Sequence, residues 1–185
     1  FVWVFSFSLA AQSVDSLSRI HWPAEYEPGQ SKFYVHNEIE IAASPEVIWE
    51  ILMDAEAWPD WYKGAKNVEL LDTAQTMLSD SATFKWKTMG LKFQSTIQEF
   101  VPPYRLSWES RKKSIRGYHA WLIIPQNGTC KVITDESQNG WLTFFEKIFQ
   151  RKKLHRLHDV WLSTLKTKAE AQQKSYSASS RNDSK

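Results

Sequence analysis

The stretch WLTFFEKIFQRKKLHRLHDVWLSTLKTKAEAQQ, residues 141–173, decides the fold. It contains no proline and no glycine, and its apolar residues recur at the spacing of one face of an α-helix. They are Trp141, Phe144, Phe145, Ile148, Phe149, Leu154, Leu157, Trp161 and Leu165. The pattern predicts one long helix from Trp141 to Gln173.

The region from Phe33 to Asn139 shows the period of β-strands instead. Apolar and polar residues alternate in Phe33–Ile41, which is typical of a half-buried strand. Six further strands are predicted in sequence, at Val68–Leu71, Ala82–Lys87, Leu91–Phe100, Arg105–Arg111, Ile115–Ile124 and Thr129–Ser137. Turn signals separate the later ones, among them the hairpin dipeptide Asn127-Gly128.

Two short helices are predicted between the first two strands. Ser44-Pro45-Glu46 combines an N-cap residue, a proline for the first helical position and an acid for the first turn, so a helix should run from there to about Asp54. A second helical turn is predicted at Trp58–Tyr62. The fold class is therefore α+β, with one curved antiparallel sheet of seven strands wrapped around the long helix.

The two ends of the chain read differently from the middle. Residues 1–30 comprise an apolar run, Phe1–Ala11, and a connector, residues 31–173 form one domain, and the serine-rich residues 174–185 are predicted to be disordered. The apolar run is either the remainder of an export signal or anchor, since Ser8-Leu9-Ala10 resembles a signal-peptidase site, or a helix packed on the domain. A cytoplasmic protein is expected, with an exported or membrane-tethered protein as the alternative.

Composition limits the possible functions. The net charge is +2, and the single cysteine, Cys130, excludes an internal disulfide and a cysteine-based zinc site. The sequence has no phosphate-binding glycine loop and no serine or cysteine nucleophile motif. Nucleic acid is not expected as a partner, because Lys85, Lys87 and Lys92 fall on the opposite strand face from the aromatic residues. Ten tryptophans, ten phenylalanines and six tyrosines are enough to line a pocket as well as to fill a core.

Several motifs together resemble a known family. They are Asn37–Ile41, Ser44–Trp49, Trp58–Tyr62, Glu99–Trp108, Gly117–Trp121, Thr134–Ser137 and His158–Leu162. In order and spacing they resemble the polyketide cyclase/dehydrase branch of the START-like (SRPBCC) superfamily, over about Phe33 to Ala171. The resemblance implies a helix-grip fold with an internal cavity for an apolar ligand, and members include lipid carriers, hormone receptors and aromatase/cyclases. No shared catalytic set comes with it.

Strand alternation indicates which side chains face the helix. The predicted ligand-binding residues are Phe84, Trp86, Trp108, His119, Trp121, Thr134, Glu136 and, on the helix, Trp161. A mostly aromatic lining with a few polar groups is the composition of a small-molecule pocket. We therefore expect binding or transport of a small hydrophobic or aromatic molecule, with a cyclase/dehydrase-type enzyme acting on a polyketide-like substrate as the alternative.

Glu136 and His119 are the candidate catalytic residues. A carboxylate that faces an apolar cavity is expected to have its pKa raised by desolvation, which suits a general acid or base near neutral pH. His119 would be its partner. The interpretation we favour over this catalytic one is that Glu136 lies in water at the sheet end and that His119 makes a structural hydrogen bond.

The remaining charged residues of the long helix are expected to be solvated. His155 and His158 are three positions apart, but with no third ligand in sequence they are predicted to be solvated or capping, and neither a metal nor a cofactor is expected. The basic residues Arg151, Lys152, Lys153 and Arg156 are interpreted as a solvated helix face. Contact with an anionic membrane is the alternative, and the oligomeric state is left open.

Overall fold

The computed structural model describes residues 19–113, 115–140 and 142–182, and for residues 142–150 and 180–182 it describes the backbone alone. The apolar run Phe1–Ala11 lies outside the described residues. The elements in chain order are η1 Ala24–Tyr26, β1 Phe33–Ile41, α2 Pro45–Met53, α3 Trp58–Trp61, β2 Lys66–Leu70, β3 Thr83–Thr88, β4 Leu91–Val101, β5 Arg105–Lys112, β6 Ile115–Gln126, β7 Thr129–Asn139 and α4 Leu142–Asn182.

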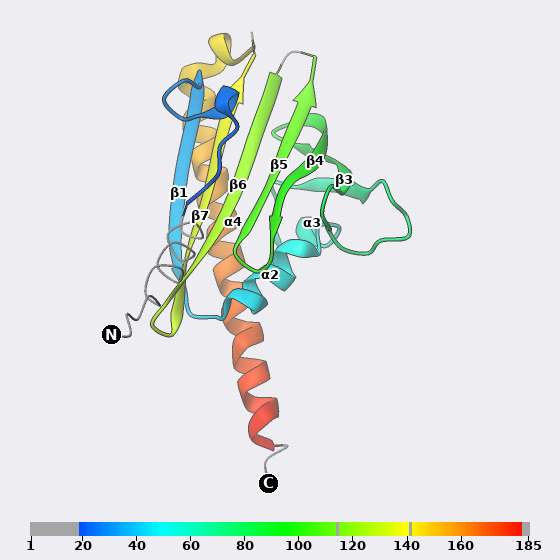
Figure 1. Cartoon of the computed structure of the whole chain (residues 1–185), viewed down its shortest axis with the longest axis vertical. Coiled ribbons are helices and arrows are strands. Elements are labelled where there is room, and N and C mark those ends of the chain that lie inside the picture. The colour runs from blue at the N-terminus through cyan, green and yellow to red at the C-terminus, as the bar shows by residue number, and fades with distance from the viewer. Residues whose placement is uncertain (1–18, 114, 141, 183–185) are drawn as a thin grey trace, which may run out of the picture.

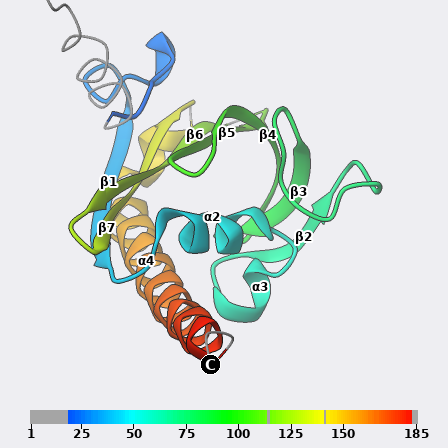
Figure 2. The ribbon, with the colours of Figure 1, turned by 60° about the horizontal axis from the view of Figure 1, so that its bottom comes forward.

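The seven strands form one antiparallel sheet in the order β1-β7-β6-β5-β4-β3-β2. Strands β2 to β7 follow one another as a meander, and β1 closes the sheet by pairing with β7. The sheet curves, with α4 lying along its concave side and α2 and α3 near one end (Figures 1 and 2). The predicted α+β class and helix-grip arrangement are confirmed.

Local signals explain the first helix. The Ser44 hydroxyl accepts a hydrogen bond from the Val47 backbone N–H, and Pro45 occupies the first turn, where its missing N–H costs nothing. The helix buries Val47, Ile48, Trp49, Ile51, Leu52 and Met53. Apolar burial on this scale anchors α2 at the end of the sheet near β1.

Helix α4 spans Leu142–Asn182, and the predicted first residue, Trp141, lies outside the described residues. The segment predicted to be disordered, residues 174–185, is thus helical as far as Asn182. Contacts with the first helix support this extension, because the Gln173 side chain accepts from the Ser44 N–H and the Tyr176 hydroxyl donates to Glu50. Composition alone did not reveal these partners.

The convex face of the sheet is covered as well. Residues predicted to be a simple connector fold back onto it, where Trp22 and Tyr26 pack against Tyr118, and the Tyr26 hydroxyl donates to Glu109 (Figure 1, dark blue). Glu109 points away from the cavity side of the sheet and is buried under this segment. Strand β6 is apolar on both faces because both are covered.

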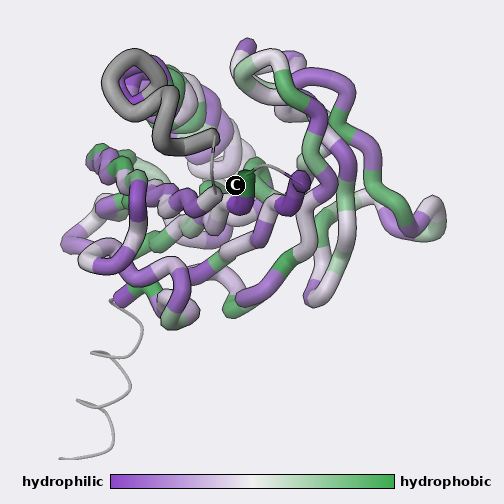
Figure 3. The backbone as a smooth tube through the Cα atoms, turned by 90° about the horizontal axis from the view of Figure 1, so that it is seen from above, coloured by the Kyte–Doolittle hydropathy of each residue, from purple (hydrophilic) through white to green (hydrophobic). Residues whose placement is uncertain are grey.

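Hydrophilic and hydrophobic residues alternate along the strands (Figure 3), as half-buried strands require. Within the described residues, no helix combines the length and the apolar character needed to cross a bilayer. The basic residues Arg151, Lys152, Lys153 and Arg156 are all exposed, as the solvated interpretation requires. Contact of these residues with an anionic membrane remains the alternative.

Candidate functional site

A cavity of about 140 Å³ lies between the concave face of the sheet and α4. It extends from the middle of the sheet towards the β3–β4 and β5–β6 turns. Its lining is Phe33, Tyr62, Trp86, Thr88, Met89, Leu91, Phe93, Trp108, Ser110, Ile115, Gly117, His119, Glu136, Gln138, Leu154, His158 and Trp161. A dry engineered cavity of about 150 Å³ is known to hold one benzene ring, so this space suits one ring or a short chain.

The eight predicted ligand-binding residues divide into two groups. Trp86, Trp108, His119, Glu136 and Trp161 line the cavity. The other three, Phe84, Trp121 and Thr134, are also buried but do not line it. Phe84 packs against Trp58 and Trp108, and Trp121 packs against Trp161, so these two rings belong to the core behind the cavity wall.

Trp161 of α4 stands at the centre of the interior. Its ring stacks on Tyr62 at 4.3 Å and meets the edges of Trp58 and Trp121 at 5.3 and 5.1 Å. Gly64 leaves room for this arrangement, because a Cβ at that position would overlap the Tyr62 ring. The indoles therefore fill much of the interior themselves, which is why the cavity is small for the amount of aromatic surface around it.

A carboxylate and two imidazoles meet in the cavity wall. His119 of β6 lies opposite Glu136 of β7 in the sheet register, and His158 reaches them from α4. The Nδ1 atom of His119 is 3.1 Å and the Nε2 atom of His158 is 3.3 Å from the same oxygen, Glu136 Oε2. The other oxygen, Oε1, accepts from the Gln138 side chain. The three groups form one cluster, which we call the His–Glu–His cluster.

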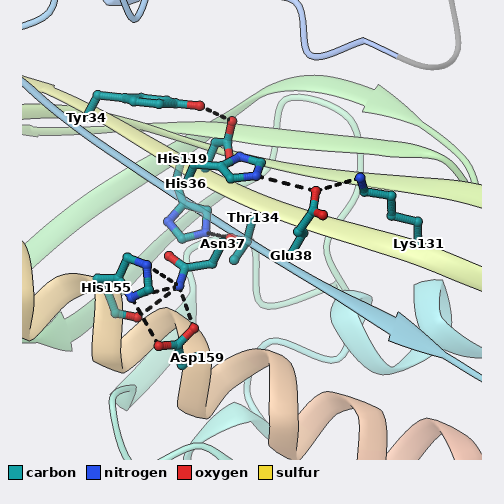
Figure 4. Close-up of polar contacts among 10 residues, drawn as sticks. Tyr34, His36, Asn37, Glu38, His119, Lys131, Thr134, His155 and Asp159 are labelled. Atoms are coloured by element: carbon teal, nitrogen blue, oxygen red, sulfur yellow. Dashed lines mark hydrogen bonds and ion pairs between the residues drawn. The ribbon is translucent and has the colours of Figure 1, made fainter.

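All three members are removed from bulk water. The side chains of His119 and His158 are 4% and 1% exposed, and that of Glu136 is 16% exposed. His119 is held from both sides: its ring stacks on Trp108 at 4.5 Å, and its Nε2 atom lies 2.8 Å from the Thr134 hydroxyl (Figure 4). Thr134, although outside the cavity lining, thus orients a residue inside it.

The electrostatics differ from the expectation of a raised pKa at Glu136. Burial alone would raise that pKa, but the hydrogen bonds and charges of His119 and His158 outweigh burial and hold it below its usual range. Burial lowers the pKa of His119 to about 4 against the opposing effect of Glu136. Near neutral pH the cluster therefore consists of an ionised Glu136 beside a neutral His119, which donates from Nδ1 while Nε2 accepts from Thr134. The prediction of a raised pKa at Glu136 is wrong.

The sequence interpretation of His158 as solvated or capping is also wrong. The residue is buried because Leu154, His158, Trp161 and Leu165 follow one another at intervals of four, three and four positions, which places them on one helix face. That spacing was visible in the sequence and identifies His158 as inward-facing. No local metal-binding motif contains His158, because the other two members of the cluster lie on strands β6 and β7.

His155 lies on a different face of α4 and is exposed. Its ring is 3.0 Å from Asp159, and the buried amide of Asn37 on β1 donates to Asp159 at 2.6 Å (Figure 4). This contact joins α4 to the edge strand of the sheet. It is separate from the cavity, whose lining contains none of these three residues.

Residues 32–170 match the model of a family described as polyketide cyclase/dehydrase and lipid transport. The chain belongs to this family. None of the curated proteins matches the sequence. The family assignment confirms the resemblance inferred from the motifs, and it supports a START-like ligand-binding role or a polyketide cyclase/dehydrase-type role in general terms.

Solved structures of several other proteins show the same fold. A hypothetical protein of Helicobacter pylori superposes with a TM-score of 0.76 at 25% identity, covering 82% of this chain and 96% of its own. A START superfamily protein of Mycobacterium smegmatis gives 0.55 at 16% identity, with 77% and 98% covered. Norcoclaurine synthase from Thalictrum flavum, solved with dopamine and hydroxybenzaldehyde, gives 0.57 at 13% identity, with 73% and 84% covered.

Proposed function

We propose that the protein binds a small aromatic or similarly flat apolar molecule in the cavity between the sheet and α4. One observation carries the proposal: the cavity of about 140 Å³ is lined by the indoles of Trp86, Trp108 and Trp161 and by the ionised carboxylate of Glu136. Apolar surface supplies most of the binding free energy at such a site, and a few fixed polar groups select the orientation.

The polar atoms of the wall specify the ligand further. Glu136 places an ionised carboxylate, a hydrogen-bond acceptor, in an otherwise mostly aromatic lining. This acceptor favours a ligand that carries a donor, such as a phenol or a hydroxylated ring. A plain hydrocarbon has no donor to offer the carboxylate.

The binding proposal is tested with freshly purified full-length protein. Native mass spectrometry is used to search for a co-purified small molecule, and tryptophan fluorescence titration measures the affinity for a panel of phenols and matched hydrocarbons. Trp108→Ala is expected to weaken phenol binding by at least 10-fold, since a large part of one wall is removed. Trp22→Ala, which removes an indole from the convex face, is the matched control and should leave the affinity unchanged.

A variant that fills the cavity gives an independent check. A Cβ atom at Gly117 would lie 3.5 Å from Glu136 Oε1 and 3.6 Å from Gln138, which is ordinary contact, so the backbone tolerates a side chain there. Gly117→Leu should then occupy the ligand space and abolish phenol binding while the protein stays folded by circular dichroism. Phenol binding that survives both Gly117→Leu and Trp108→Ala contradicts binding in this cavity.

An enzymatic role is the second candidate, and the His–Glu–His cluster favours it. An ionised carboxylate can stabilise the positive charge that develops on an adjacent imidazole when that imidazole takes a proton from a bound ligand. If the protein is an enzyme of the cyclase/dehydrase type, Glu136→Gln should remove turnover and leave the affinity for the substrate within a few-fold. Turnover that is insensitive to this change would contradict the catalytic role.

A further inference from the structure

The His–Glu–His cluster brings three metal-ligating atoms together from three separate elements. One nitrogen of each imidazole and one carboxylate oxygen lie within 4.8 Å of one another. The nitrogens that approach Glu136 Oε2 are His119 Nδ1 and His158 Nε2. Within the described part of the chain, no other set of three histidine, cysteine or carboxylate side chains meets this condition. No sequence motif predicts the cluster, because its residues are contributed by three separate elements, β6, β7 and α4.

The distances within the cluster match the edges of a coordination polyhedron. With metal–ligand bonds of about 2.0–2.2 Å, neighbouring ligands of a tetrahedral ion stand about 3.4 Å apart. The two measured edges, from Oε2 to each imidazole nitrogen, are 3.1 and 3.3 Å. Both imidazoles approach the same carboxylate oxygen, so the three atoms form a compact triangle that one ion can cap.

The surroundings of the cluster are those of a metal site. A ligating imidazole usually binds a hydrogen-bonding group through its other nitrogen, and His119 has such a partner in the Thr134 hydroxyl at 2.8 Å. The carboxylate is similarly held by Gln138 at its second oxygen. On His158, the Nδ1 atom is buried without a partner, so no second hydrogen bond opposes a small rotation of this ring towards an ion.

The charge balance also suits a divalent ion. Two neutral imidazoles and one carboxylate provide a single negative charge, which leaves a bound divalent ion with a net positive charge. Each imidazole can bind an ion while staying neutral if its proton lies on the other nitrogen, which is Nε2 of His119, beside the Thr134 hydroxyl, and Nδ1 of His158. All three residues line the cavity, so a further coordination position faces the space assigned to the organic ligand.

We propose that His119, Glu136 and His158 bind one divalent transition-metal ion, with Zn²⁺ as the ion that best fits this donor set. Two histidines and one glutamate are a donor set of catalytic zinc sites, in which the fourth position holds water or substrate. The fourth position here is open to an oxygen of a molecule in the cavity. The inference concerns the metal itself and does not require the organic ligand of the proposed function.

The test uses full-length protein without a histidine tag, stripped of metal with a chelator and then dialysed. Isothermal titration with ZnCl₂ should give one high-affinity site per chain, and CoCl₂ should give the visible absorption of four-coordinate Co²⁺. Glu136→Gln and His158→Gln keep the side-chain volume, so that a folded variant is obtained. Each should weaken Zn²⁺ binding by at least about 100-fold, more than the loss of a supporting hydrogen bond causes.

Supporting and control variants separate this site from surface histidines. Thr134→Val should weaken Zn²⁺ binding by about 10- to 100-fold, because it removes the group that orients His119. His155→Ala, on the same helix but outside the cavity, and His36→Ala, on the convex face, should leave it unchanged. The absence of stoichiometric Zn²⁺ binding overturns the proposal, as does binding that persists in both Glu136→Gln and His158→Gln.

The two proposals fail separately. Phenol binding by the chelator-treated protein without any Zn²⁺ binding would retain the proposed function and overturn the metal site. Stoichiometric Zn²⁺ binding that depends on Glu136 and His158, but without binding of any aromatic molecule, would retain the metal site and remove the proposed ligand.

Discussion

Two consecutive residues of β7, Asp135 and Glu136, build carboxylate–histidine clusters on opposite faces of the sheet. Asp135 faces the convex side, where its Oδ1 is 2.7 Å from His36 Nδ1 and its Oδ2 accepts from the Tyr34 hydroxyl at 2.6 Å. Glu136 faces the cavity and meets His119 and His158. The same residue types, one position apart, thus occupy two different environments.

The difference lies in how the donors are distributed. On the convex face each oxygen of Asp135 has its own partner, and His36 keeps 44% of its side chain in solvent. On the concave face two buried imidazoles share a single oxygen, and His158 keeps an unpaired nitrogen. The first arrangement satisfies its polar groups and stabilises the fold. The second arrangement leaves an imidazole nitrogen without a hydrogen-bond partner, which is typical of a ligand-binding or catalytic site.

The pKa values of the two carboxyls shift in opposite directions. Burial raises the pKa of Asp135, and its bonds to Tyr34 and His36 offset this only in part. At Glu136 burial also acts upward, but two imidazoles overcome it and lower the pKa. Asp135 has one imidazole partner and Glu136 has two, and the second of these is His158 of α4. Helix α4 thus makes the difference between a carboxylate–histidine pair and a candidate site.

The largest predicted loss of stability is in the core between the sheet and α4, compared with the cluster on the convex face. Trp161→Ala removes the central indole of the concave interior, which is 1% exposed, and should lower the free energy of unfolding by about 3–5 kcal/mol. Trp22→Ala on the half-buried convex cluster should cost clearly less. Urea unfolding of both variants gives the comparison. Equal losses would mean that the segment over the convex face contributes as much stability as the interior.

The fold could be predicted because its signals are local. Alternation along the strands and the helical period of residues 141–173 are properties of neighbouring residues, and they determine which side faces the core. Packing between distant segments was not predictable in this way. The cover of Trp22 and Tyr26 over Tyr118 joins the start of the chain to β6, and composition alone described that start as a connector.

The candidate site was predicted only in part, because some of its features follow from local patterns and others depend on distant residues. Strand alternation placed Glu136 and His119 on the face towards the helix, where the structure has them. The sign of the Glu136 pKa shift was missed because it depends on the hydrogen bonds and charges of His119 and His158 together, and His158 is 22 residues away in sequence. Counting donors around a carboxylate requires the tertiary structure, whereas burial can be guessed from the pattern.

A second prediction tests whether only the convex cluster is structural. Asp135→Ala leaves the Tyr34 hydroxyl and His36 without their acceptor and should lower the free energy of unfolding by about 1–3 kcal/mol. His158→Leu, measured with a chelator present, leaves Glu136 with His119 and Gln138 as hydrogen-bond partners and should therefore lower it by less than about 1.5 kcal/mol. Urea unfolding at neutral pH measures both. A larger loss from His158→Leu than from Asp135→Ala would reverse the assignment of roles.

The smallest predicted effect concerns the bond between the N-terminal segment and the convex face. Tyr26→Phe removes the hydroxyl that donates to Glu109 and should cost about 1 kcal/mol near neutral pH, since Arg111 still pairs with the carboxylate. Burial, with the nearby Glu109, raises the pKa of Tyr26 above its ordinary value of 10.0, so the folded state favours the protonated phenol.

This shift fixes the sign of the pH dependence. Below pH 10 the phenol is protonated in both the folded and unfolded states, and the stabilisation by Tyr26 is fully present. Above that pH the unfolded chain releases the proton first, so the stabilisation declines as the pH rises. The difference in unfolding free energy between wild type and Tyr26→Phe should therefore be constant at neutral pH and decrease in alkaline buffer. A difference that grows in alkaline buffer would mean that the hydroxyl is not held as a donor to Glu109.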